Sequence, residues 1–178
     1  MKTTDLKQPV LKPQDLFVVL KVAVTRVERP SYAGLAHELF MSASEVHAGV
    51  QRAVLSHLLE REQGVLIVNR ASLREFLLCG VRYAFPAMEG PVARGLPTGV
   101  SAPPFHQSFE QADLLPLVWP DIKGEVRGVS VCPLYPTVPA ACRQDPKLYH
   151  VLTAFEALRG GRAREREFAK EVLIETLA

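Results

Sequence analysis

The sequence predicts a mainly α-helical chain with a small β component, in which a regular N-terminal part precedes an irregular, Pro-rich α+β part. In the first part apolar residues recur at helical spacing. From Gly80 onward, prolines and glycines interrupt that spacing. We therefore expect two domains, residues 1–80 and residues 81–178.

The N-terminal domain is expected to begin with three helices. The first covers Leu11 to Val27, with Pro13 in its first turn, a position that tolerates proline. Two more fill Ser31 to Leu59, because each half of this segment carries one apolar stripe. Ser42 and Glu45 have the spacing of a capping box, so the last of these helices should begin directly after Ser42.

The helix that follows Ser42 has a polar outer face. With Val46 and Val50 turned inward, at about 100° per residue, the outward positions are Ser44, Ala48, Gln51 and Arg52, with Glu45 at the margin and His47 on one flank. Short side chains near a helix start allow close approach to a DNA groove, and Gln or Arg can hydrogen-bond to base edges.

Three short sequence segments in this region resemble those of a known family: Tyr32-Ala-Gly-Leu-Ala36, Met41-Ser-Ala-Ser-Glu-Val46 and Gln51-Arg52-Ala53. Together they resemble the helix-turn-helix of bacterial regulators of the AsnC/Lrp and MarR kinds. His37-Glu-Leu-Phe40 departs from that pattern because it is bulkier than the usual short turn. The resemblance implies DNA contacts from Ser42, Ser44, Glu45, His47, Ala48, Gln51 and Arg52. An antiparallel helix pair in an ordinary α-helical domain is the alternative interpretation.

The residues after Leu59 favour the winged version of this reader. Glu60 to Gly64 indicates a turn, and Val65 to Val68 has strand character, although no partner strand is apparent. Ser72 and Glu75 repeat the capping-box spacing, which predicts a helix from there to about Tyr83.

The C-terminal domain is expected to hold little regular structure at first. Ala87 to Phe109 predicts an ordered but irregular path, Leu114–Trp119 and Gly124–Val131 predict short strands, and Pro133 to Pro139 continues the irregular path. Asp145 and Pro146 should then begin a helix that runs to about Arg159. Gly160 and Gly161 should end it, and a last helix should start at Arg162.

Two groups of arginines in this domain are candidate binding residues. Arg162, Arg164 and Arg166 could bind phosphate or an acidic partner, or could form a solvated helix start with internal ion pairs. Arg94 stands between prolines in the aromatic-rich irregular path and could anchor an anion or carboxylate. Core packing is the competing role of that path.

Composition excludes few classes of function. The net charge of +2 is not that of a strongly basic protein, but a local footprint suffices for DNA, with candidates at Lys12, Lys21, Arg26, Arg29, Arg52, Arg61 and Arg70. Neither a membrane span nor a signal peptide is apparent, so a cytoplasmic location is expected. The Cys and His residues show no metal-ligand spacing, and neither a metal nor a cofactor is expected.

These observations predict a DNA-binding transcription regulator that forms a homodimer on double-stranded DNA. The layout is similar to that of AbiEi-like antitoxins, which implies a toxin partner and autoregulation of an antitoxin or defence operon. A protein-interaction module that uses the helix-turn-helix only as scaffold is the second hypothesis. An enzyme is disfavoured: the Arg–His pairs Arg143/His150 and Arg52/His57 match the loose spacing of HEPN-type ribonucleases, but no catalytic residue set is recognisable.

Overall fold

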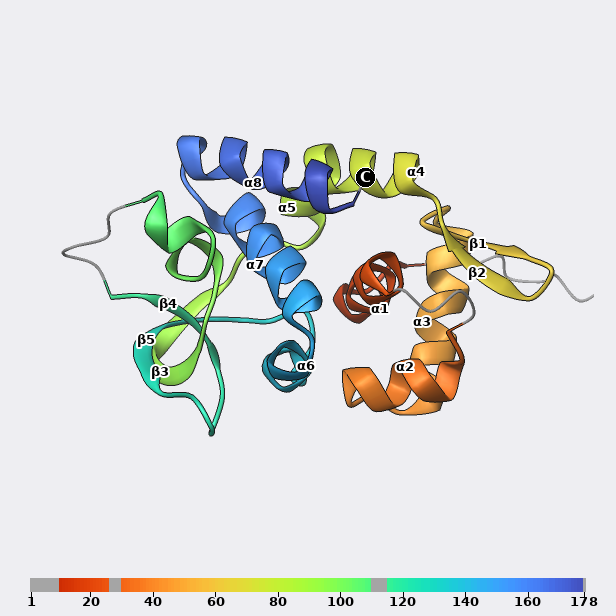
Figure 1. Ribbon diagram of the computed structural model, residues 1–178, viewed down its shortest axis with the longest axis horizontal. Coiled ribbons are helices and arrows are strands. Elements are labelled where there is room, and N and C mark those ends of the chain that lie inside the picture. The colour runs from red at the N-terminus through yellow and green to blue at the C-terminus, as the bar shows by residue number, and fades with distance from the viewer. Residues whose placement is uncertain (1–9, 26–29, 110–114, 178) are drawn as a thin grey trace, which may run out of the picture.

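The computed structural model describes residues 10–25, 30–109 and 115–177. The protein is mainly helical with small sheets, and its N-terminal helices are followed by a short hairpin. Figure 1 shows these helices and the hairpin at one end of the molecule, a small three-stranded sheet at the other end, and three C-terminal helices between them. The described residues contain no helix long and apolar enough to cross a membrane.

The three N-terminal helices are confirmed, although two of them end earlier than expected: α1 (Pro13–Val24), α2 (Tyr32–Leu39) and α3 (Ala43–Leu55). Thr25 after α1 is already extended, and α3 ends four residues before Leu59, which belongs to a strand. Of the expected first helix, residues 26 and 27 lie outside the described part of the chain. Residues 15–23 of α1 are all buried, because α2, α3 and a C-terminal helix pack around it. The turn between α2 and α3 passes through Phe40, whose φ of 54° lies in the left-handed region.

A β-hairpin follows α3. The partner strand for Val65–Val68 that was not apparent in the sequence is present: β1 (Leu59–Glu62) pairs antiparallel with β2 (Val65–Val68). Gln63 and Gly64 both have positive φ, at 49° and 79°, which is the backbone twist that a two-residue hairpin turn requires. The charged sequence of β1 concealed the strand, because three of its four side chains face solvent.

The hairpin leads into one helical segment made of α4 (Arg70–Glu75), a π-helical turn η1 (Phe76–Gly80) and α5 (Val81–Ala84). The expected start at Ser72 is two residues late, because the Asn69 side chain accepts a hydrogen bond from the Ser72 N–H at 3.0 Å and caps the helix. The expected domain boundary, between residues 80 and 81, falls inside this segment.

The expectation of an irregular path from Ala87 to Phe109 is wrong in part, since β3 (Glu89–Pro97) is a nine-residue strand. It pairs antiparallel with both β4 (Leu117–Pro120) and β5 (Val126–Val131), which are parallel to each other, so the three strands close on themselves. Gly95 and Gly128 allow this closure, because a side chain at either position would collide with a backbone carbonyl of β4 or of the residue before it. Two short 3₁₀ turns, η2 (Gly99–Ser101) and η3 (Phe105–Gln107), follow β3.

Three helices complete the chain: α6 (Val138–Gln144), α7 (Pro146–Gly160) and α8 (Ala163–Thr176). The start of α7 at Asp145 and the break before α8 are as predicted. Helix α6 corrects the expectation of an irregular path through Pro139, since proline is compatible with a first helical turn. Helix α7 is buried from Val151 to Arg159, and the hydrophobic core is continuous from α1 through α7 to α8.

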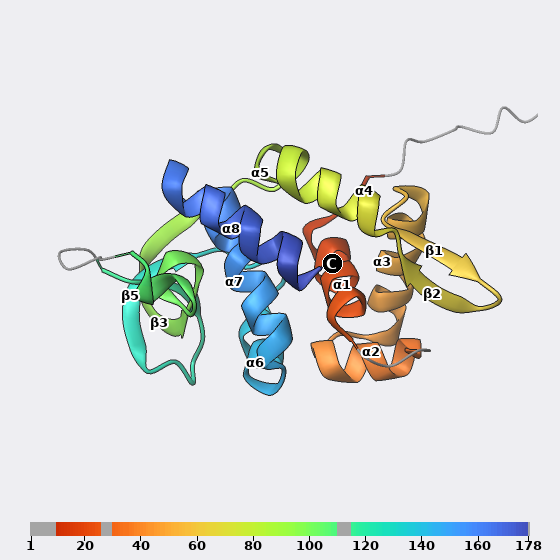
Figure 2. The same cartoon turned by 45° about the horizontal axis from the view of Figure 1, so that its top comes forward.

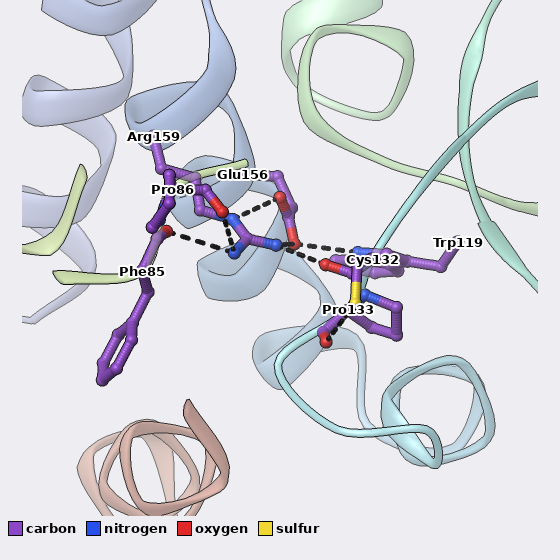
Figure 3. A network of polar contacts seen from close by, with 7 residues as sticks. All are labelled: Phe85, Pro86, Trp119, Cys132, Pro133, Glu156 and Arg159. Atoms are coloured by element: carbon purple, nitrogen blue, oxygen red, sulfur yellow. Dashed lines mark hydrogen bonds and ion pairs between the residues drawn. The ribbon is translucent and has the colours of Figure 1, made fainter. Parts of the chain in front are cut away.

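A buried polar network ties α7 to the small sheet (Figure 3). The Arg159 guanidinium donates to both carboxylate oxygens of Glu156 at 2.7 Å and to the Cys132 carbonyl at 2.6 Å. It also donates to the carbonyls of Phe85 and Pro86, and the Trp119 indole N–H donates to Glu156 at 2.9 Å. Because both charges are buried and fully bonded, this network can fix the relative positions of four segments.

Candidate nucleic-acid interface

One face of α3 does not pack into the hydrophobic core. Val46 and Val50 are buried, as predicted, and Ala53 is buried with them. Among the side chains on the other side, Ser44 and His47 are exposed, and Ala48 and Gln51 are half-buried. Gly49 faces α1, where a side chain would crowd the Asp15 carboxylate, so α3 and α1 approach closely at this point. The exposed face is therefore held on a rigid support.

The predicted capping box at the start of α3 is confirmed. The Glu45 N–H donates to the Ser42 hydroxyl at 3.2 Å, and the Ser42 N–H donates to the Glu45 carboxylate at 3.2 Å. The Ser44 hydroxyl lies 3.0 Å from that of Ser42. The first turn of α3 thus carries exposed hydroxyl groups beside backbone N–H groups, which is chemistry suited to a phosphate oxygen.

Four side chains from three elements meet on the exposed side of α3. The Tyr32 ring of α2 makes an edge contact with the His47 ring at 5.1 Å, and Gln51 Nε2 lies 3.3 Å from His47 Nε2. Arg61 of β1 donates to the Tyr32 hydroxyl, and its guanidinium lies 5.9 Å from the centre of the Tyr32 ring. We call Tyr32, His47, Gln51 and Arg61 the α3-face cluster. It links the helix face to the hairpin.

The expectation that Arg52 points outward is wrong. Its guanidinium donates to both oxygens of Asp15, at 2.6 and 2.7 Å, and Asp15 is completely buried on α1. Asp15 also accepts from the Lys12 N–H at 2.8 Å. Because a buried carboxylate needs a cation, Arg52 is committed to joining α3 and α1. The sequence signal for this pair was Asp15 itself, an acidic residue within an apolar helix.

Two other basic side chains of the expected DNA-binding footprint also bind groups within the protein. Lys21 is buried and lies 2.5 Å from Glu38 and 2.7 Å from Asp145. Arg70 donates to the Leu177 carbonyl at 2.6 Å. Lys12 and Arg61 are exposed, while Arg26 and Arg29 lie outside the described residues. Within the described ranges, Arg61 of the hairpin is the member of this footprint that contacts the cluster beside α3.

The C-terminal half touches α3 at its first turn. The Tyr135 hydroxyl donates to Glu45 at 2.7 Å, and the Thr137 hydroxyl donates to the Leu39 carbonyl at 2.7 Å in the turn before α3. The hydrogen bonds from Tyr135 and Ser42 lower the pKa of Glu45, and the contact with Glu45 raises the pKa of Tyr135. Glu45 is therefore engaged in holding the turn, and sequence reasoning missed Tyr135 because it is distant in the chain.

The expected arginines of the C-terminal half lie on separate elements. Arg94 is exposed on β3, directly opposite the exposed Arg127 of β5. Arg162 and Arg164 are exposed at the start of α8. Arg166 is half-buried and donates to the Gly161 carbonyl at 2.8 Å. The Glu165 carboxylate accepts from the Arg162 N–H at 2.5 Å, so the internal bonding of a helix start accounts for part of this group.

The arginine of each Arg–His pair is bound to an aspartate. The Arg143 guanidinium donates to Asp121 at 2.6 and 2.9 Å, and the Arg52 guanidinium is bound to Asp15 as described above. His57 is exposed beyond the end of α3, with a φ of 57°. In the described part of the chain, no three His, Cys, Asp or Glu side chains are placed to hold a metal ion.

Comparisons with known proteins give no relative from which to carry over a function. No family model matches the chain, and no curated protein or solved structure matches it significantly. The geometry of this chain alone supports the proposals that follow.

Proposed function

We propose that this chain is a cytoplasmic, sequence-specific DNA-binding transcription regulator. In this proposal α1, α2, α3 and the β1–β2 hairpin form a winged helix-turn-helix, and α3 enters the major groove. The observation that carries the proposal is the α3-face cluster, in which the exposed side of α3 and the hairpin arginine form one continuous polar surface. Gln51 can hydrogen-bond to base edges, and Arg61 can reach a phosphate beside the groove.

The supporting geometry agrees with this role at both ends of α3. Exposed hydroxyl groups of Ser42 and Ser44 stand at its start, where backbone contacts usually fix the register of a reading helix. Along its length, the inward side is fixed to α1 by apolar packing and by the Arg52–Asp15 pair. A preorganised helix loses less entropy on binding.

A gel-shift with the DNA upstream of the gene tests the proposal. We expect a shifted band with that duplex at lower protein concentration than with an unrelated duplex of equal length, and binding that weakens steeply as salt is raised. Equal binding to both duplexes would remove sequence specificity, and binding to neither would remove the proposed function.

We also propose that the chain reads DNA as a homodimer, because half-sites usually require two readers spaced by about 34 Å or a multiple of it. Light scattering of the free protein and of its DNA complex tests this. A single chain at micromolar concentration, both free and on DNA, would contradict it.

The second candidate function is a protein-interaction module, such as an antitoxin that binds a toxin. Arg94 and Arg127 favour it, because like charges directly opposite each other on a sheet repel, and no carboxylate among the described residues forms an ion pair with either. An acidic partner would supply the missing charge. If co-expression with the neighbouring gene product gives a complex that Arg94→Ala abolishes while DNA binding is absent, this function replaces the first.

A further inference from the structure

A groove with an apolar floor lies between α8 and the helical segment that follows the hairpin. It encloses about 270 Å³. Leu77, Leu173 and Leu177 form its buried floor, and the partly exposed Ile174 stands at its rim. In both Figure 1 and Figure 2, the C-terminal end of α8 lies next to α4, so the groove joins the last helix to the segment after the hairpin.

Two arginines line the same groove. Arg70 and Arg74 are one turn apart on α4 and therefore lie on the same side of the helix. Arg70 is held in place by one hydrogen bond to the Leu177 carbonyl. Arg74 is exposed, and the described residues provide neither a hydrogen bond nor an ion pair for its side chain. The groove thus combines apolar surface with two cationic groups, and no carboxylate among the described residues forms an ion pair with either.

We infer that this groove binds a small carboxylic acid with an apolar body. The guanidinium groups of Arg70 and Arg74 would take the carboxylate, since arginine matches the two oxygens of that group in a planar fork. The leucine floor would take the hydrocarbon part, which inorganic phosphate lacks. The groove volume is that of a small molecule. A stable protein partner would need a contact surface of about 800 Å² on each side, and this groove is a local hollow lined by a few residues.

The ligand would also lie close to the hairpin. Arg70 follows Asn69, whose side chain caps α4 and donates to Glu60 of β1 at 2.7 Å. A ligand that draws α8 and α4 together therefore acts at Arg70, two residues after the end of the hairpin. This regulatory consequence rests on the proposed function, whereas binding in the groove does not. We expect the ligand to change DNA affinity through the position of the hairpin.

Calorimetry with octanoate and 1-octanol tests the site, because the two probes share an apolar body and differ in charge. We expect octanoate to bind with one site per chain and 1-octanol to bind at least about tenfold more weakly. Arg74→Ala should weaken octanoate binding by at least about tenfold. Arg82→Ala, an exposed arginine of α5 outside the groove, should leave it unchanged. Equal affinities for the two probes, or for the two variants, would overturn the inference.

Two further variants distinguish ligand binding in the groove from misfolding and from dimerisation. Ala71→Trp places a large side chain at an exposed position of the groove wall, so it should abolish octanoate binding while the circular dichroism spectrum stays unchanged. If instead Ile174→Glu converts a dimer to a monomer and the parent binds no octanoate, a second copy covers the groove and the inference fails. If octanoate binds as expected but no duplex does, the site stands and the proposed function fails.

Discussion

Helices α3 and α7 each carry an arginine bound to a carboxylate through two hydrogen bonds, yet they stand in opposite environments. In α7 nine consecutive residues are buried, and the Arg159–Glu156 pair lies inside the molecule. In α3 only the side toward α1 is buried, and the Arg52–Asp15 pair lies at the border between core and solvent. The same kind of ion pair therefore lies within the core in α7, whereas in α3 it binds one side of the helix to α1 and the opposite side stays exposed.

An arginine on a helix therefore indicates little about function until the carboxylate that it binds is located. Arg159 and Arg52 are both committed to holding elements together. The exposed face of α3 instead presents His47 and Gln51, whose side chains do not pack in the core. A binding function for α3 should therefore be separable from stability by substitution.

The largest expected effect is the loss of the buried pair in α7. Arg159→Leu leaves Glu156 buried without its cation and should lower the free energy of unfolding by about 3–5 kcal/mol. Glu167→Gln, which breaks the exposed Lys170–Glu167 pair of the same spacing in α8, should cost less than about 0.5 kcal/mol. Urea unfolding of both variants checks the contrast, and similar losses would show that burial does not decide the strength of these pairs.

A smaller effect is expected from the pair in α3. Arg52→Ala leaves the buried Asp15 carboxylate with only the Lys12 N–H and should cost about 2–3 kcal/mol of stability. Gln51→Ala, one residue away, should change stability by less than about 0.5 kcal/mol. If thermal unfolding found Arg52→Ala as stable as the parent, Arg52 would be free to read DNA after all.

Local signals in the sequence were sufficient for α3 and α7, but they missed Asn69, the cap of α4. Ser42 with Glu45 and Asp145 with Pro146 placed α3 and α7 correctly, because a capping side chain acts within three residues of itself. The free side of α3 followed from helical periodicity. The same periodicity placed Arg52 on that side, since the partner that turns it inward, Asp15, lies on another helix.

Features that depend on distant partners were missed. Strand β3 contains Pro91 and Pro97 and forms because β4 and β5 pair with it, which no local pattern could show. Arg61 joins the α3 face only because the hairpin folds back toward Tyr32. The hydrogen bond from Tyr135 to Glu45 spans 90 positions in the chain.

A still smaller effect is expected in the hairpin. Gly64→Ala puts a side chain at a φ of 79° and should destabilise the hairpin by about 1 kcal/mol. Gln63→Asn, at a φ of 49°, should be neutral or slightly stabilising, because asparagine tolerates that conformation. Hydrogen exchange of the β1 and β2 amides measures both. Faster exchange in Gln63→Asn than in the parent would contradict the assigned turn.

The contact between α1 and α7 predicts a pH dependence. Burial raises the pKa of Asp145, but hydrogen bonds from Lys21 and from the Leu148 N–H outweigh it and hold the pKa below the usual 3.8. A depressed carboxyl pKa adds stability above about pH 4, and this stability is lost as the pH falls through the folded pKa. Asp145→Asn keeps the cap and should flatten this acid limb in urea unfolding between about pH 6 and pH 3. An unchanged slope would show that other carboxylates dominate it.

The most direct test of the central claim is the DNA affinity of Gln51→Ala by fluorescence anisotropy, with the upstream duplex at fixed salt. If the exposed face of α3 reads bases, this variant should lose about 1–3 kcal/mol of binding free energy, with normal stability. Gln107→Ala, the same change at an exposed residue of η3, should bind as the parent does. Equal affinities of Gln51→Ala, His47→Ala and the parent would contradict the assignment of this face as the reader.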